Sequence, residues 1–149
     1  MTRNSLTKTS YEAALHLLKY RGQSEEELRR KLKIRGYESG DIEKTIQRLK
    51  EYRYIDDESL SEDLFNALRN RHCYGDTYIH QKMKARGLRT DRHLTYEDEF
   101  QDALHLVQVK CRIFPHFLDH YRKAAAFLQR RGFSSAVTRA VLAEFTFTD

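Results

Sequence analysis

A six-residue pattern that occurs three times constrains this chain more than any other feature of its sequence. A large apolar residue is followed by two spacers, an arginine, a glycine and a second large apolar residue, at positions 32–37, 83–88 and 128–133. The three glycines are 51 residues apart (36 to 87) and 45 residues apart (87 to 132). A period in this range is typical of arrays of helical repeats.

Each copy of the pattern has the chemistry of a helix end. The arginine (Arg35, Arg86 or Arg131) suits the negative end of the helix dipole. The glycine after it suits the left-handed backbone that commonly ends a helix, and the next apolar residue can pack back beneath the turn. A second helix is expected after each copy, with its cap at Ser39, at Thr90 or Asp91, and at Ser134.

The remaining composition also favours helices. The chain has one proline and six glycines, and every glycine falls where a helix is expected to begin or end. No segment alternates between apolar and polar residues as a half-buried strand does. We therefore predict an all-α fold: a tandem array of three three-helix repeats, elongated and curved. The predicted parts are a flexible N-terminus (1–9) and repeats at 10–56, 57–95 and 96–149.

Local signals place several helix boundaries within these repeats. Ser24 and Glu27 form a capping-box pattern, in which each side chain bonds the backbone amide of the other residue. Pro115 is expected at the start of a helix, where proline is tolerated best. The third helix of the second repeat, in the region 90–94, has few apolar residues and is expected to be short or irregular. Other expected caps are Asp56 or Asp57, and Asp76 or Thr77.

The sequence gives no sign of a membrane or secreted protein. No window of about 18 residues is apolar enough to span a bilayer, and residues 1–5 lack the apolar core of a secretory signal. The two cysteines, Cys73 and Cys111, are not in a CxxC motif. We expect both to be free, half-buried thiols in helices, and the protein to be cytoplasmic.

The common catalytic and nucleotide-binding motifs are missing from the sequence, so we expect neither an enzyme nor a cofactor. There is no GxxxxGK[ST], GxGxxG or GxSxG. His116 and His120 have the i,i+4 spacing of a helical metal site, but no third ligand is evident nearby. The simpler interpretation is two surface histidines, and no metal site is predicted.

Basic residues are concentrated in the middle of the chain. The formal net charge is +5, and the segment from Arg69 to Arg92 contains seven basic residues against two acidic ones. Tyr74 and Tyr78 lie among them. Such a segment can be an ordinary solvated helix face. Cations interleaved with aromatic rings also suit a phosphate backbone or an acidic protein groove.

The ordered motifs resemble the RecX family of regulatory proteins over about residues 13–145. In the first repeat they are Arg21-Gly22-Gln23-Ser24, Glu27-Leu28, Lys31-Leu32, Gly36-Tyr37, Ile46, Leu49-Lys50-Glu51 and Tyr54-Ile55-Asp56-Asp57. In the second they are Arg71, Gly75, Ile79, Lys82-Met83 and Arg86-Gly87; in the third, Arg122-Lys123, Phe127-Leu128 and Arg131-Gly132-Phe133-Ser134. The chain departs from the family at Asp76, where proline is frequent.

This resemblance implies a modulator of the RecA recombinase that is not itself an enzyme. Members of the family are arrays of three-helix repeats that lie along the RecA–DNA filament and restrain recombination, ATP hydrolysis and coprotease activity. The implied partners are the RecA filament and, weakly, single- and double-stranded DNA, with no membrane and a monomeric state. The candidate contacts are Arg29, Arg30, Lys33, Arg69, Arg71, Lys82, Lys84, Arg86, Arg89, Arg130 and Arg131.

Two other functions are compatible with the sequence. A stand-alone helix-turn-helix regulator would also use short helix–glycine–helix steps, but it needs one recognition helix rich in base-reading side chains. Here the cations are shared among three similar units, which favours an array. A helical adaptor for another protein is the third possibility, and the absence of both RecA and DNA binding would favour it.

Overall fold

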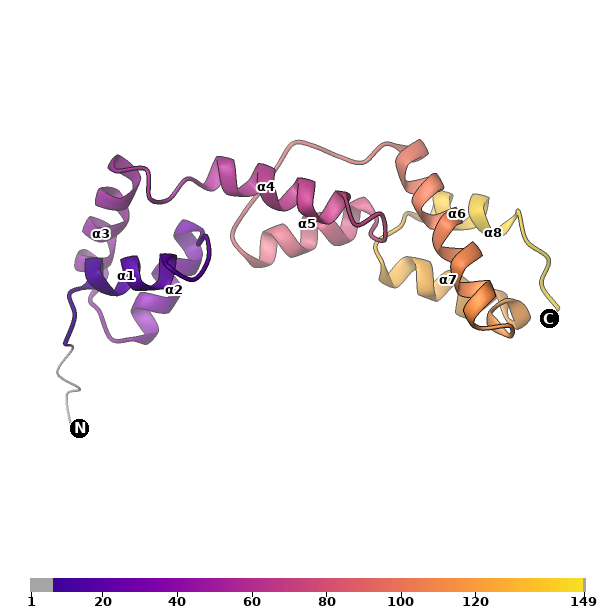
Figure 1. The fold of residues 1–149 in the computed structure, drawn as a ribbon, viewed down its shortest axis with the longest axis horizontal. Helices are drawn as coiled ribbons and strands as arrows, with labels where there is room; N and C mark the ends of the chain where they lie inside the picture. Colours follow the sequence, from indigo (N-terminus) through magenta and orange to yellow (C-terminus); the bar gives the residue numbers. More distant parts are fainter. Residues whose placement is uncertain (1–6, 149) are drawn as a thin grey trace. The chain divides into compact units, whose positions relative to one another are not determined.

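The computed structural model describes residues 7–148, and this part of the chain is all helical (Figure 1). The predicted all-α fold class is therefore confirmed. Among the described residues there are eight α-helices, one 3₁₀ helix and no strand. Their bounds are α1 Ser10–Leu18, α2 Glu25–Ile34, α3 Ser39–Glu51, α4 Asp57–Arg69, α5 Asp76–Ala85, α6 Tyr96–Ile113, η1 Phe117–Asp119, α7 Tyr121–Arg130 and α8 Ser135–Leu142.

The described chain forms two compact units. The N-terminal unit contains residues 7–62 together with 84–89, and the C-terminal unit contains residues 63–83 together with 90–148. The segment 57–95 therefore contributes to both units. The division of the sequence into three repeats stays a prediction, and most of the predicted flexible N-terminus lies outside the described residues.

The N-terminal unit is built on the mutual packing of α1, α2 and α3 (Figure 1). The predicted capping box begins α2: Ser24 Oγ accepts from Glu27 N at 3.0 Å, and Ser24 N donates to Glu27 Oε1 at 3.0 Å. At the other end of α2, Gly36 has φ +95° and Tyr37 N bonds Leu32 O, as a Schellman turn requires. The core comprises Ala13, Ala14, Leu28, Leu32, Ile42, Ile46, Leu49 and Ile55.

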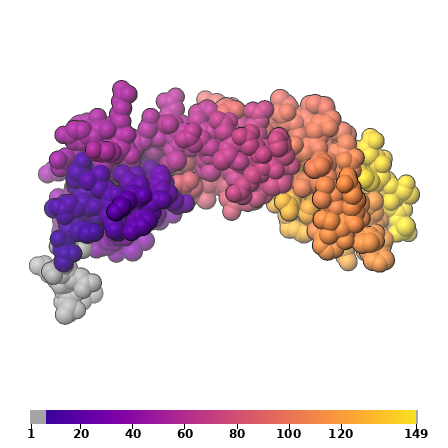
Figure 2. Space-filling view, viewed as in Figure 1, coloured from indigo at the N-terminus to yellow at the C-terminus, as the bar shows by residue number. Residues whose placement is uncertain are grey.

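In the C-terminal unit, α8 packs against both α6 and α7. In the space-filling view the orange atoms, which include the end of α6 and η1, form part of the front of this unit (Figure 2). A second capping box starts α6, with Thr95 Oγ1 accepting from Asp98 N at 3.1 Å. The core comprises Ala103, Val107, Ala124, Leu128, Phe133, Val137, Val141 and Leu142.

The segment between α5 and α6 contains no helix, so residues 57–95 contribute two α-helices. The helix expected after Thr90 or Asp91 does not form. Thr90 Oγ1 accepts from Arg92 N at 3.1 Å, and Leu94 N donates to Asp76 Oδ1 at 2.8 Å. Such side-chain bonds offer the backbone an alternative to the helical ladder, and too few apolar residues are present to favour the helix.

Three predicted helix starts need correction. Pro115 lies between the end of α6 and η1, so it begins no α-helix. Ser39 is the first residue of α3, whose cap position is occupied by Glu38 without a side-chain cap bond. Asp76 accepts from Leu94 N rather than capping its own helix. Of the two aspartates expected at α4, Asp56 is the one that accepts from Ser59 N, at 3.2 Å.

The same junction is built once in each unit. In the N-terminal unit, Arg86 O accepts a hydrogen bond from Ser24 Oγ, at the start of α2. In the C-terminal unit, Arg131 O accepts from Gly75 N at 2.7 Å, directly before α5. The second arginine–glycine turn therefore contacts the start of α2, the helix that leads into the first copy. The third turn likewise contacts the start of α5, the helix that leads into the second copy.

An acidic side chain completes each junction. Asp57 Oδ1 accepts from Glu25 N, the first amide of α2, at 3.0 Å. Glu99 Oε1 accepts from Asp76 N, the first amide of α5, at 2.8 Å. Carboxylates are favourable at these positions because the first amides of a helix lack intrahelical partners and carry the positive end of its dipole. The sequence repeat thus corresponds to a repeated set of contacts.

Candidate interaction surface

The predicted contacts on α2 differ in how far their charge is already neutralised. Arg29 Nε lies 2.7 Å from Glu43 Oε1, and Arg30 lies 3.6 Å from Glu26. The hydrogen bond to Glu43 raises the pKa of Arg29, although its partial burial opposes the shift. Lys33 is exposed and makes no ion pair within the described residues. Of these three cations, Lys33 is the most available to a partner.

Arg86 is held inside the N-terminal unit. Its guanidinium donates to Glu27 Oε1 at 3.0 Å and to Gly22 O at 2.9 Å. The Glu27 side chain is only 6% exposed and that of Arg86 22%. Burial by itself would raise the pKa of Glu27, but hydrogen bonds from Arg86 and Ser24 and the charges of Arg86 and Arg21 outweigh it and lower the pKa. Arg86 thus supports the fold at this position.

The other basic residues predicted near α5 are divided between the two units. Lys84 and Arg89 belong to the N-terminal unit and are exposed, with no ion pair in the described chain. Lys82 belongs to the C-terminal unit, where its Nζ lies 5.3 Å from the centroid of the Tyr78 ring. Tyr78 in turn stacks on Tyr74 at 4.0 Å between ring centroids. The predicted interleaving of tyrosines and cations is present around Lys82.

Arg69 and Arg71 lie at the end of α4 and just beyond it. Arg69 is 3.8 Å from the carboxylate of Asp98, at the limit of an ion pair. Arg71 is exposed. Its hydrogen bond to Tyr74 lowers the pKa of that phenol, but the hydrogen bond between Tyr74 and Tyr78 and partial burial outweigh it, so the pKa of Tyr74 is raised. These residues are accessible, but Arg69 already has an acidic neighbour.

A basic groove lies along α7 in the C-terminal unit. It has a volume of about 370 Å³, and we call it the α7 groove. Its lining includes no acidic residue, and none of its four cations makes an ion pair among the described residues. The lining residues are Lys110, Phe117, Arg122, Lys123, Ala126, Phe127 and Arg130.

One cation of the α7 groove, Lys110, lies over aromatic rings. Lys110 Nζ lies 4.3 Å from the Phe114 ring centroid and 5.0 Å from that of Phe127. Next to the groove residue Arg130 in sequence, Arg131 has its guanidinium 4.9 Å from the Phe127 ring centroid. A cation over an aromatic face is attracted by the ring quadrupole while its remaining donors stay available. The groove therefore combines unpaired positive charge with the half-buried rings of Phe117 and Phe127.

Sequence reasoning found only part of this groove. Arg130 and the adjacent Arg131 were predicted as contacts, whereas Lys110, Arg122 and Lys123 were not. A helical signal was present, because Arg122 and Arg130 are eight residues apart and share one face with Ala126. The contribution of Lys110 comes from α6 and depends on tertiary packing.

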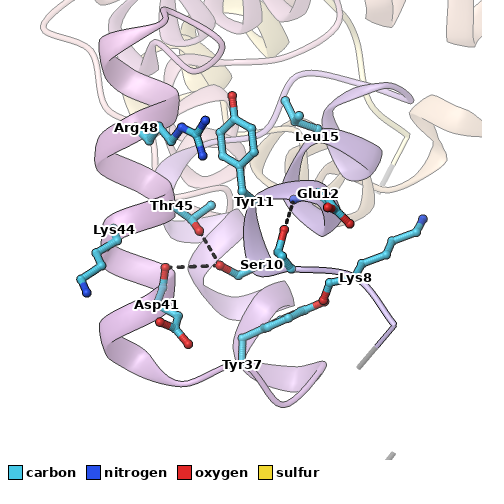
Figure 3. A pocket seen from close by; sticks show the side chains of 11 residues that line it. Lys8, Ser10, Tyr11, Glu12, Leu15, Tyr37, Asp41, Lys44, Thr45 and Arg48 are labelled. Atoms are coloured by element: carbon cyan, nitrogen blue, oxygen red, sulfur yellow. Dashed lines mark hydrogen bonds between the residues drawn. The ribbon is translucent and has the colours of Figure 1, made fainter. Parts of the chain in front are cut away.

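A groove in the N-terminal unit has a different character (Figure 3). It has a volume of about 830 Å³ and lies between α1 and α3. Its lining includes three cations (Lys8, Lys44 and Arg48) and two carboxylates (Glu12 and Asp41). The Arg48 guanidinium lies 4.1 Å from the Tyr11 ring centroid. This mixture of signs gives no preference for a polyanion. None of the predicted contact residues lines it.

The histidines and cysteines considered for metal and thiol chemistry lie in the C-terminal unit. His116 bonds Asp119 at 2.9 Å, and no metal-binding group of three ligands includes His116 or His120 among the described residues. Cys73 and Cys111 are free and partly buried, but Cys73 lies in the irregular segment between α4 and α5 rather than in a helix. Burial raises the pKa of the Cys111 thiol, which disfavours the reactive thiolate.

The fold and its surface define a class: an all-helical repeat protein with unpaired cations on both units. The family domain described as "RecX, first three-helix domain" matches residues 11–49. The regulatory protein RecX of Trichlorobacter lovleyi is 31% identical, covering 93% of this chain and 97% of its own length. That of Stenotrophomonas maltophilia is 33% identical, covering 85% and 80%. The chain belongs to the RecX family.

Solved structures agree on the fold. The crystal structure of RecX from Lactobacillus salivarius superposes with a TM-score of 0.74 at 22% identity, covering 91% of this chain and 93% of that one. A second structure of a regulatory protein RecX has a TM-score of 0.75. In the described part of the chain, no helix combines the length and hydropathy needed to cross a bilayer.

Proposed function

We propose that this protein binds the RecA–DNA filament and inhibits the recombinase, ATPase and coprotease activities of RecA, without enzymatic activity of its own. The observation that carries the proposal is membership of the RecX family along 93% of the chain, at 31% identity to a protein named as a regulatory protein. The resemblance of the motifs to that family implies RecA as the partner. We place the protein in the cytoplasm, where the filament forms.

The distribution of unpaired cations supports contact at several points. Lys33, Lys84 and Arg89 are exposed on the N-terminal unit, and the α7 groove lies on the C-terminal unit. Linking weak contacts in one chain raises the effective concentration of each after the first has formed. A filament of identical protomers offers repeated sites for such a chain. Arg86 supports binding indirectly, by fixing the turn between Lys84 and Arg89.

The α7 groove is the strongest single candidate for a polyanionic contact. Cations without acidic neighbours can exchange counterions for phosphates or carboxylates, and exposed rings can stack on bases. The helix-turn-helix alternative would require these residues to be concentrated on one base-reading helix. Here α2, α5, α7 and the turn after α5 all contribute cations, so contact with an extended partner fits better.

The test is DNA-dependent ATP hydrolysis by RecA while this protein is titrated in, at low and moderate salt. We expect inhibition well below one copy per RecA protomer, since one chain acts on a filament segment. The inhibition should weaken as salt rises, because cation–phosphate contacts release counterions. A sample that is helical by circular dichroism but has no effect at equimolar ratio would contradict the proposal. Sequence-specific footprints on duplex DNA would instead support the helix-turn-helix alternative.

A further inference from the structure

Asp76, His80 and His93 lie together in the C-terminal unit, outside every surface considered above. One ligand atom from each residue lies within 4.8 Å of the other two. Asp76 and His80 are four residues apart on α5 and therefore share a helix face. His93 comes from the non-helical segment that follows α5 in sequence. Sequence spacing alone gives no indication of this third residue.

The distances suit a small divalent ion of intermediate softness. Asp76 Oδ1 lies 3.5 Å from His80 Nε2, and Asp76 Oδ2 lies 2.7 Å from His93 Nδ1. Zinc bonds of about 2.0–2.1 Å at tetrahedral angles place neighbouring ligand atoms about 3.3 Å apart. The His93 side chain is 65% exposed and comes from a loop, so it can adjust to meet an ion. Two imidazoles and one carboxylate form a common zinc ligand set.

The surroundings of the cluster hold the carboxylate in place. Asp76 Oδ1 accepts from Leu94 N at 2.8 Å, which orients the carboxylate toward the two rings. The imidazoles of His80 and His93 are stacked, with centroids 4.6 Å apart. His80 Nε2 lies 2.9 Å from Arg92 O, a hydrogen bond that an ion at Nε2 would replace. Hydrogen-bonded ligands of this kind are typical of protein metal sites.

We propose that Asp76, His80 and His93 bind one Zn²⁺ ion and that the ion fastens the segment 90–94 to the start of α5. The three side chains are ligands, and the fourth position is open to water. The ion stabilises the part of the middle segment where a third helix is missing. Because the ligands come from a helix and a loop, ion binding is coupled to ordering of that loop. The proposal does not depend on any action on RecA.

The test is calorimetric titration of the full-length, chelator-treated protein with Zn²⁺, in a Cys73→Ser/Cys111→Ser background that removes thiol ligands. We expect one Zn²⁺ per chain and at least a tenfold loss of affinity in His93→Ala and in Asp76→Asn. Asparagine retains an oxygen that can accept from Leu94 N, so the second variant keeps the local fold. The matched control, His116→Ala/His120→Ala, should bind Zn²⁺ as the parent does.

Amide hydrogen exchange provides an independent measurement. Zn²⁺ should slow exchange at residues 92–94 in the parent but not in His93→Ala, while Mg²⁺, which prefers oxygen ligands, should slow it in neither. Equal Zn²⁺ affinity in the parent and both site variants would overturn the proposal. So would binding that the His116→Ala/His120→Ala control abolishes, or the absence of a stoichiometric site in the parent.

Discussion

The guanidinium of Arg86 lies 3.0 Å from the carboxylate of Glu27, a residue 59 positions earlier in the chain. Glu27 also completes the capping box of α2, and Arg86 is the arginine of the second arginine–glycine copy. One ion pair therefore joins the start of a helix to the turn that closes on it. Arg21 approaches the other oxygen of Glu27 at 2.8 Å but is 55% exposed.

Arg86→Met should destabilise the protein by about 2–4 kcal/mol, since breaking a largely buried ion pair leaves a charge without its partner. Arg21 remains near Glu27 and limits the loss. The matched control is Arg29→Met, because Arg29 pairs with Glu43 at the surface, where solvent screening makes such a pair contribute little to stability. Urea denaturation followed by circular dichroism measures both values. Equal losses in the two variants would show that Arg86 has no special role.

The Glu27 carboxylate also predicts how stability responds to acid. Its pKa is lowered in the folded protein, below the usual value near 4.5. The stabilisation is therefore fully present above pH 4.5 or so, and it is lost as pH falls through the lower, folded-state value. Glu27→Gln should lower the stability of the protein at neutral pH and make its loss of stability below about pH 4.5 shallower. Denaturation midpoints measured from pH 6 to pH 3 test this.

Asp57 provides a contrast of opposite sign. Burial raises its pKa above the usual value, despite the hydrogen bond from Glu25 N. A carboxylate of this kind binds more protons in the folded state than in the unfolded state. Its contribution to the stability of the folded protein therefore increases as pH falls toward its ordinary pKa. Asp57→Asn should therefore make the acid decline steeper, whereas Glu27→Gln makes it shallower. If both variants changed the pH dependence of stability in the same direction, a raised pKa for Asp57 and a lowered pKa for Glu27 would be contradicted.

The helix boundaries that depend on local chemistry were predictable from sequence, unlike those expected at Ser39, Asp76 and Pro115. The capping box at Ser24 and the three arginine–glycine turns use neighbours in the chain, and Gly36, Gly87 and Gly132 all adopt positive φ. For the helix expected after Thr90, which does not form, the sequence contains one warning: the segment has few apolar residues. The irregular structure that replaces this helix depends on Asp76, which accepts a hydrogen bond from Leu94 N, 18 residues away. Bonds of that range leave no periodic signal in the sequence.

The candidate surface was less predictable, for the same reason. Clustering of charge along the chain predicted Lys82, Lys84 and Arg89 as contacts, and all three are exposed. It could not show that Glu27 engages Arg86 or that Glu43 engages Arg29. Nor could it show that Lys110 joins Arg122 and the rest of α7 in one groove. Which cations are unpaired is decided by tertiary contacts.

The three repeated glycines should differ in how poorly they tolerate alanine. A Cβ at Gly36 would meet nothing within 4 Å, so Gly36→Ala should cost only the left-handed backbone, about 1–2 kcal/mol. At Gly87 a Cβ would lie 2.6 Å from Glu26 Cβ, and at Gly132 it would lie 2.3 Å from Tyr78 N. Since backbone yields less than a side chain, we expect the loss of stability to increase from Gly36 to Gly87 to Gly132. Denaturant titration of the three variants gives the order, and equal losses would exclude close packing as the cause.

Charge reversal at Lys82, Lys84 and Arg89 together should weaken binding to the RecA–DNA filament without unfolding the protein. All three side chains are exposed, and none makes an ion pair among the described residues. Filament affinity is measured by fluorescence anisotropy of the labelled protein, with circular dichroism as the control for folding. Unchanged affinity would remove these residues from the contact surface.

Neutralising the α7 groove should reduce filament binding in a salt-dependent manner. The variant Arg122→Gln/Lys123→Gln/Arg130→Gln removes three unpaired cations while keeping an unbranched polar side chain of similar helix propensity at each position. Each lost phosphate contact lowers the slope of log affinity against log salt by roughly 0.7–0.9. The matched control, Lys19→Gln/Lys44→Gln/Arg139→Gln, removes the same charge from exposed positions outside the groove. We expect the groove variant to bind more weakly and with a shallower slope than the control. Identical slopes in the two variants would show that only net charge matters and that the groove itself contacts no polyanion.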